Sequence, residues 1–178
     1  QETTLFQELS VFENALIGAH MKSRTNVFSA VLGLDRLKQE AASEKVMEVL
    51  EFMGLIERRD QLAAELPLGS QRALALAIAL VSEPKLMLMD EPFGALDVST
   101  RLQMQDLLLD IWNEYHPTIV FVTHDIPEAV YLADDIYIMK SAPSRFVEHI
   151  HVDLPLKRER STKRDPRYIE LVQQVEDT

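Results

Sequence analysis

The sequence contains no cysteine, no long apolar run and few basic residues for its acidity. The absence of cysteine excludes disulfide bonds and thiolate metal sites. The longest apolar run, Ala73 to Val81, has nine residues, whereas a membrane-spanning helix needs about 20. A formal net charge of −11 argues against a nucleic-acid-binding surface, because phosphate contacts require clustered Lys and Arg. We therefore expect a chain that neither spans a membrane nor binds nucleic acid.

One segment departs from this acidity. Residues 157–167 hold six basic side chains against two acidic ones. Such a segment is either a solvated tail or a patch for lipid or nucleic acid. Interleaved aromatic side chains would favour a patch, but the first aromatic residue is Tyr168, so we expect a solvated tail.

Glycine is scarce, and its positions exclude a phosphate-binding loop of the Walker A type. Such a loop needs two glycines five residues apart, followed by Lys and then Ser or Thr, because backbone amides wrap the phosphates while the lysine neutralises them. The glycines are separated by 15, 21, 15 and 25 residues, standing at Gly18, Gly33, Gly54, Gly69 and Gly94. The sequence therefore contains no Walker A loop.

The first 65 residues are predicted to be mainly helical. Ser10 and Glu13 have the spacing of a capping box, which predicts a helix through residues 15–20. Apolar residues recur at helical spacing after Ser43, and Gly54 suits the left-handed residue that ends such a helix. This part of the chain is therefore predicted to consist mainly of helices.

From Gly69 onward the pattern changes to helices alternating with short apolar runs of strand length. This alternation is typical of an α/β fold, in which crossover helices connect the strands of a parallel sheet. The expected strands are residues 85–90, 118–123, 135–140 and 145–154. The expected helices are residues 73–81, a stretch that places Met104, Leu108, Ile111, Trp112 and Tyr115 on one face, and residues 168–175.

Two carboxylates, Asp90 and Glu91, directly follow the apolar run at residues 86–89. Ligands of open α/β sheets bind at the carboxyl ends of the strands. One carboxylate there could contact Mg²⁺ while the other orients or deprotonates a water molecule. Taken alone, however, a strand that ends in Asp-Glu is more often a solvated turn.

Three neighbouring patterns favour the chemical interpretation. Residues 66–72 (LPLGSQR) open the alanine-rich helix, residues 94–97 (GALD) follow the carboxylates, and His124 ends the next strand. In this order and spacing they resemble the signature motif, Walker B strand, D-loop and switch histidine of the nucleotide-binding domain of ATP-binding cassette transporters. The resemblance implies part of a RecA-like P-loop NTPase sheet joined to an α-helical subdomain. It divides the chain into residues 1–68 (Q-loop and helical subdomain), 69–154 (core with the motifs) and 155–178 (polar tail with a short helix).

The resemblance also implies a role for each matching residue. Asp90 would contact Mg²⁺ through its ligand shell, Glu91 would polarise the attacking water, and His124 would touch the γ-phosphate of ATP. Asp97 would act across a dimer interface, and Gln1 matches the Q-loop glutamine, which belongs to the Mg²⁺ shell. The amino end of the signature helix would face the γ-phosphate of ATP bound by the other subunit, through Leu68, Gly69, Ser70 and Gln71.

The signature motif departs from the family pattern at several positions. Pro67 replaces the usual serine, Leu68 the following glycine and Ser70 the usual glutamine. Ile78 stands where an arginine is expected in the middle of the helix. Pro67 removes one hydroxyl donor to phosphate. These changes put the efficiency of hydrolysis in question rather than the fold.

By resemblance the protein is the ATPase subunit of an importer, with ATP and Mg²⁺ as cofactors. Its partners would be a second ATPase subunit, transmembrane permease subunits and, indirectly, a solute-binding protein, at the cytoplasmic face of the plasma membrane. Residues 1–67 look most like importers of branched-chain amino acids, whereas the chain from Phe93 onward looks like importers of nitrate, sulfonates and taurine. The family places its Walker A loop upstream of Gln1, so the chain looks like a truncated cassette that is inactive alone.

Other hypotheses remain open. The chain could be a non-catalytic interaction module that pairs with a complete cassette, or part of an ATPase of repair or translation. The helical subdomain disfavours the latter. His149 and His151 alternate on one strand face, which could serve a metal, but an exposed edge strand is the more common explanation.

Overall fold

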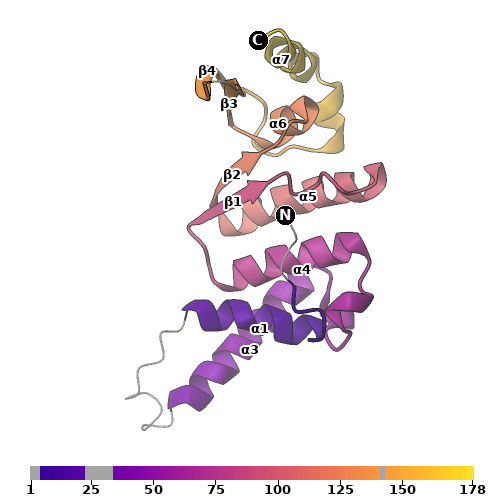
Figure 1. Cartoon of the computed structure of the whole chain (residues 1–178), viewed down its shortest axis with the longest axis vertical. Coiled ribbons are helices and arrows are strands. Elements are labelled where there is room, and N and C mark those ends of the chain that lie inside the picture. Colours follow the sequence, from indigo (N-terminus) through magenta and orange to yellow (C-terminus); the bar gives the residue numbers. More distant parts are fainter. Residues whose placement is uncertain (1–4, 23–33, 141–142) are drawn as a thin grey trace. The chain divides into compact units, whose positions relative to one another are not determined.

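The computed structural model describes residues 5–22, 34–140 and 143–178, and Figure 1 shows the order of their elements. The chain forms two compact units. The first unit comprises residues 1–87 and 96–100, and the second comprises residues 88–95 and 101–178. None of the helices in the described ranges combines the length and the hydropathy that crossing a bilayer requires. The functional division of the chain predicted from the motifs stays a prediction.

The first unit is built from helices α1 (Val11–Lys22), α3 (Leu34–Phe52) and α4 (Leu68–Val81), with short 3-10 turns at Ile56–Arg58 and Ala63–Glu65. Helix α1 packs against both α3 and α4. Gly18 lies directly against the backbone of Ile78, where any side chain would collide. The core between the helices contains Val11, Ala15, Val46, Val49, Leu50, Leu74 and Ala77.

The start of α1 and the end of α3 are capped as the sequence predicts. The amide of Ser10 donates to Glu13 Oε2 (2.8 Å) and the amide of Glu13 donates to Ser10 Oγ (3.2 Å), which confirms the capping box. At the end of α3, Gly54 has a φ of 67°. The amide of Leu55 reaches the carbonyl of Leu50, and that of Gly54 reaches Glu51, the paired bonds of a Schellman motif.

The start of α3 differs from the prediction. The helix begins at Leu34, well before Ser43. The sequence LDRLKQE that precedes Ser43 consists mostly of strong helix formers. The apolar periodicity that predicted the helix begins only at Val46, so it could not mark this polar first part.

The motifs lie on a β-α-β unit made of β1 (Leu86–Asp90), α5 (Val98–Tyr115) and β2 (Thr118–Val122). Strands β1 and β2 pair with each other as a parallel pair. The predicted apolar face of α5 is confirmed in its middle, since Met104, Leu108 and Ile111 are buried. The carboxyl ends of β1 and β2 therefore lie at one edge of the sheet.

The rest of the second unit contains α6 (Ile126–Leu132), β3 (Asp135–Lys140), β4 (Arg145–His151), a 3-10 turn at Arg160–Arg164 and α7 (Pro166–Glu176). Strands β3 and β4 pair antiparallel, with an irregularity between Ile138 and Met139. Strand β4 ends at His151 rather than at the predicted Leu154, because its partner strand begins at Asp135, opposite His151.

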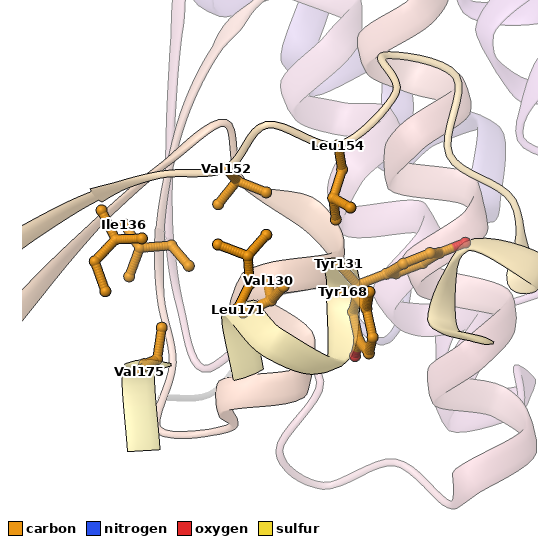
Figure 2. Packing of buried hydrophobic residues seen from close by; sticks show 9 residues of the cluster. Val130, Tyr131, Ile136, Val152, Leu154, Tyr168, Leu171 and Val175 are labelled. Carbon is orange, nitrogen blue, oxygen red and sulfur yellow. The ribbon is translucent and has the colours of Figure 1, made fainter. Parts of the chain in front are cut away.

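The core of the second unit joins α6, the hairpin and α7 (Figure 2). Tyr131 and Leu171 are fully buried in it. The hydroxyl of Tyr168 donates to the carbonyl of Pro127 (2.9 Å), which ties α7 to the start of α6. The carboxyl-terminal helix is therefore an integral part of this unit. The other members of the cluster are Val130, Ile136, Ile150, Val152, Leu154 and Val175.

The expectation that residues 157–167 form a solvated tail is wrong only in part, since most of these residues are exposed but the segment is anchored to the rest of its unit. Arg158 is buried, and its guanidinium donates to the carbonyls of Tyr131 (3.3 Å) and Ala133 (2.7 Å) and to Asp134 Oδ1 (2.8 Å). Arg160 pairs with Asp106 at 2.8 Å. These partners precede the segment by 24 or more residues, so a local count of charges could not reveal them.

Candidate functional site

Glu91 directly follows β1, and its backbone conformation is unusual. Its φ is 44°, in the left-handed region that non-glycine residues rarely adopt. Its amide donates to the carbonyl of Val122 on β2 (2.8 Å). The carbonyl of Glu91 accepts the amide of Gly94 (3.2 Å), so the chain turns sharply here. The strained backbone is thus anchored to the neighbouring strand, and it redirects the Glu91 side chain as the strand ends.

His124 ends the neighbouring strand and meets Glu91. The two side chains are joined by a contact of 2.8 Å between His124 Nδ1 and Glu91 Oε1. A carboxylate oxygen can only accept a hydrogen bond, so Nδ1 carries the proton. Nε2 is then left to accept from, or when protonated to donate to, a bound group. The His124 side chain is 78% exposed and that of Glu91 43%, so both can be reached by a ligand.

The turn that carries His124 leads straight into α6. Asp125 is the amino-terminal cap of this helix, since its Oδ1 accepts the amide of Glu128 (3.0 Å). Its Oδ2 lies 3.2 Å from Arg101 Nη1 on α5. The Glu128 side chain is buried and contacts Thr123. Sequence analysis missed Glu128; the Asp-x-x-Glu spacing at residues 125–128 signals a helix start, but not the inward direction of this side chain.

Asp97 caps α5 in the structure. Its Oδ1 accepts the amides of Ser99 (3.0 Å) and Thr100 (3.1 Å), and its Oδ2 accepts the hydroxyl of Thr100 (2.6 Å). The hydrogen bonds from Thr100 hold the pKa of this exposed carboxyl below its usual value. Asp97 therefore stays ionised at neutral pH. Its action across a dimer interface stays a prediction.

The four predicted residues of the signature motif, Leu68 to Gln71, form the first turn of α4. Pro67 occupies the cap position and provides no side-chain cap. The first amides of a helix point outward and favour an anion. A side chain at Gly69 would collide with the Thr100 side chain, so glycine allows this helix end to approach the start of α5. Gln71 is already engaged, because its Nε2 donates to the carbonyl of Leu66 (2.9 Å).

The residues suit Mg²⁺ only in combination with a bound phosphate. In the described part of the chain no three His, Asp or Glu side chains gather as a metal site. Mg²⁺ in nucleotide sites is usually held by one or two carboxylates together with phosphate oxygens and water. Asp90, at the carboxyl end of β1, could supply such a carboxylate. Gln1, the other residue predicted for the metal, lies outside the described residues.

His149 and His151 lie on an exposed strand and share one carboxylate. His149 Nε2 lies 2.8 Å and His151 Nδ1 3.2 Å from Asp135 Oδ1. These contacts hold the pKa of Asp135 below its usual value. Figure 1 shows β4 beside β3, and the two form a two-stranded sheet. The edge-strand interpretation is supported, since both histidines have a partner within the hairpin.

Comparisons with known proteins agree with the motifs. Residues 1–94 match the family model described as ABC transporter. The aliphatic sulfonates import ATP-binding protein SsuB of Bacillus licheniformis is 46% identical over 126 residues, which is 71% of this chain and 49% of that protein. The taurine import ATP-binding protein TauB of Pseudomonas savastanoi pv. phaseolicola is 38% identical over 148 residues, 80% of this chain and 56% of that protein.

A solved structure supports the same fold. The chain resembles a dimeric bacterial ABC transporter cassette with a TM-score of 0.63 and 25% sequence identity. The match covers 85% of this chain and 60% of the cassette. The chain thus spans about half to three fifths of the length of the proteins that it matches.

Proposed function

The chain belongs to the ABC transporter family, and from that premise we propose that it forms the part of an importer's ATPase subunit that begins at the Q-loop. In this proposal it binds ATP together with a Walker A loop from outside the sequence, and pairs with a second ATPase subunit. Permease subunits then use the energy of hydrolysis to admit a solute.

The contact between Glu91 and His124 carries the proposal. Two side chains from adjacent strand ends, 2.8 Å apart and accessible, meet at one edge of a sheet, where we propose that Glu91 accepts a proton and His124 contacts phosphate. Glu91 is placed to orient or deprotonate a water molecule. His124, held through Nδ1, would leave Nε2 free to contact a γ-phosphate. Mg²⁺ near Asp90 would neutralise phosphate charge there.

The exposed apolar side chains of β1 and β2 support the view that more of a cassette covers this sheet. Leu88 is 72% exposed, Val120 46% and Val122 49%. Exposed apolar surface on a strand pair is unfavourable in water and is typical of a surface that another part of a protein covers. We propose that the part of the cassette upstream of Gln1, which includes the Walker A loop, provides this layer.

The names of the relatives support a sulfonate as the solute. SsuB is named for the import of aliphatic sulfonates and TauB for that of taurine, which also carries a sulfonate group. We therefore favour a sulfonate over a branched-chain amino acid, to which residues 1–67 pointed. An interaction module without catalysis remains the second candidate, because the sequence has no Walker A loop.

The test is the stimulation of ATP hydrolysis in the assembled transporter. The cassette, completed with the coding sequence upstream of Gln1, is reconstituted with its permease and binding protein. Taurine and ethanesulfonate should stimulate phosphate release, while leucine serves as the control. Stimulation by leucine alone would overturn the assignment of the solute. No hydrolysis with any solute, in spite of an intact Walker A loop, would favour the non-catalytic module.

A further inference from the structure

Glu128 is a buried carboxylate that the proposed chemistry does not use. It is 4% exposed, and of the described residues it is the only buried Asp or Glu. Both of its oxygens accept hydrogen bonds: Oε1 from Gln105 Nε2 and Oε2 from Thr123 Oγ1, each at 2.9 Å. Burying a charge is costly unless it is fully hydrogen-bonded. A buried carboxyl group whose two oxygens are both hydrogen-bonded is a candidate for a structural or positioning role at the turn that it contacts.

Hydrogen bonds connect Glu128 to both chain neighbours of His124. On one side, Thr123 Oγ1 donates to Glu128 and accepts the amide of Asp125 (3.0 Å). On the other side, Asp125 Oδ1 accepts the amide of Glu128 (3.0 Å). Hydrogen bonds among Thr123, Asp125 and Glu128 thus fix the turn that carries His124. Because the His124 side chain is 78% exposed, little packing holds it, and its position depends on this turn and on the contact with Glu91.

A second layer fixes the orientation of Gln105. Its Oε1 accepts a hydrogen bond from Lys163 Nζ (2.8 Å), so its amide nitrogen must face Glu128. The ammonium of Lys163 also lies 4.1 Å from the centre of the Tyr131 ring. Lys163 belongs to the basic segment near the carboxyl terminus. A continuous chain of hydrogen bonds therefore runs from that segment to the turn that bears His124.

We propose that Glu128 is a positioning residue for His124, and that Gln105 and Lys163 hold Glu128 in its place. The carboxyl-terminal segment then helps to set the geometry of the Glu91–His124 contact. The inference rests on the role proposed above for His124. Glu128 itself does not touch the nucleotide.

The network allows a test by exchange of donor and acceptor. Glu128→Gln leaves only one acceptor oxygen: the new amide nitrogen faces either Gln105 Nε2, another donor, or Thr123 Oγ1, which must then accept instead of donate, so the present hydrogen-bond pattern is disrupted in both orientations. Gln105→Glu places two carboxylates together. The double variant Gln105→Glu/Glu128→Gln restores both pairings and the net charge, and it keeps an acceptor for Lys163. If Glu128 positions His124, each single variant should lower the rate of ATP hydrolysis, and the double variant should restore it.

The first readout is steady-state hydrolysis by the completed cassette, because small displacements of catalytic groups reduce turnover more than binding. Each single variant should lower kcat about tenfold with KM for ATP changed less than about twofold, and the double variant should recover kcat to within about threefold of the wild type. Glu170→Gln, at the exposed partner of Arg167, is the matched control for loss of one carboxylate and should leave kcat unchanged.

The second readout is the ¹⁵N resonances of the His124 ring in the same proteins, identified by their loss in His124→Ala. The Nδ1-protonated pattern should weaken in each single variant and return in the double variant. Unchanged ring resonances and kcat in Glu128→Gln would overturn the inference. If kcat falls in the single variants together with the melting temperature, and the double variant does not restore kcat, Glu128 has a structural role and the inference is overturned. If the wild type does not hydrolyse ATP, the proposed function fails, but the ring resonances still test the positioning.

Discussion

At the scale of single residues, the backbone of Glu91 places its carboxylate. A φ of 44° is costly for a residue with a side chain, about 1–3 kcal/mol. The bond from its amide to Val122 and the contact with His124 hold this conformation. Such strain clusters at active sites, ligand clamps and switch regions.

Glu91→Gln in the completed cassette should keep ATP binding and abolish turnover. The amide oxygen can still accept from His124 Nδ1, so the local geometry is preserved, but an amide cannot accept the proton of the attacking water. We expect phosphate release to fall at least about 100-fold while nucleotide-dependent dimerisation persists. Glu57→Gln, at an exposed position remote in sequence, is the control. Retention of more than about a tenth of the activity would show that Glu91 is not the base.

At the scale of elements, Gly54 and Gly18 of the first unit serve different purposes. Gly54 ends α3 with a positive φ, and nothing lies within 4 Å of an added Cβ. Gly18 has no positive φ, but the backbone of Ile78 occupies the space that a Cβ would need. The first glycine is therefore required by its conformation and the second by close packing.

Gly54→Ala should thus destabilise the protein by about 1 kcal/mol, the cost of a left-handed conformation for a residue with a Cβ. Gly18→Ala should cost more, about 1–3 kcal/mol or above, because α1 must move away from α4. Urea unfolding followed by circular dichroism measures both differences. A larger loss for Gly54→Ala than for Gly18→Ala would contradict this account of the helix packing.

The carboxyl-terminal segment makes a second prediction at this scale. Arg158→Ala removes a guanidinium whose side chain is only 2% exposed and leaves the carbonyls of Tyr131 and Ala133 without this donor. We expect a loss of about 2–4 kcal/mol in the free energy of unfolding. Arg160→Ala, which breaks a more exposed pair with Asp106, should cost less than about 1 kcal/mol. Equal losses in urea unfolding would show that Arg158 is no more structural than its neighbour.

These elements also show what sequence alone can predict. The capping box at Ser10 and the end of α3 at Gly54 depend on neighbouring residues, and both predictions are confirmed. Glu91 and His124 could be expected to meet because both follow strands of one β-α-β unit. The buried positions of Arg158 and Glu128 could not, because their partners lie on other elements and the direction of each side chain depends on the packed unit.

At the scale of the whole molecule, we propose that the chain supplies one part of a nucleotide site and that another part lies outside its sequence. It carries Asp90, Glu91 and His124, and its sequence contains no Walker A loop. It spans 49% of SsuB and 56% of TauB. Without the amides and lysine of that loop, two carboxylates would repel a nucleotide. The exposed end of α4 would offset this repulsion by only about 0.3–1 kcal/mol.

Calorimetric titration with Mg-ATP tests this central claim most directly, with the 178-residue chain beside the cassette completed upstream of Gln1. The account predicts saturable binding to the completed cassette and none to the chain alone. The Walker A loop supplies the lysine and most of the amides that hold the phosphates. Saturable binding to the chain alone with a Kd below about 100 μM, close to −5.5 kcal/mol, would contradict the account, because it would place the nucleotide site within these residues.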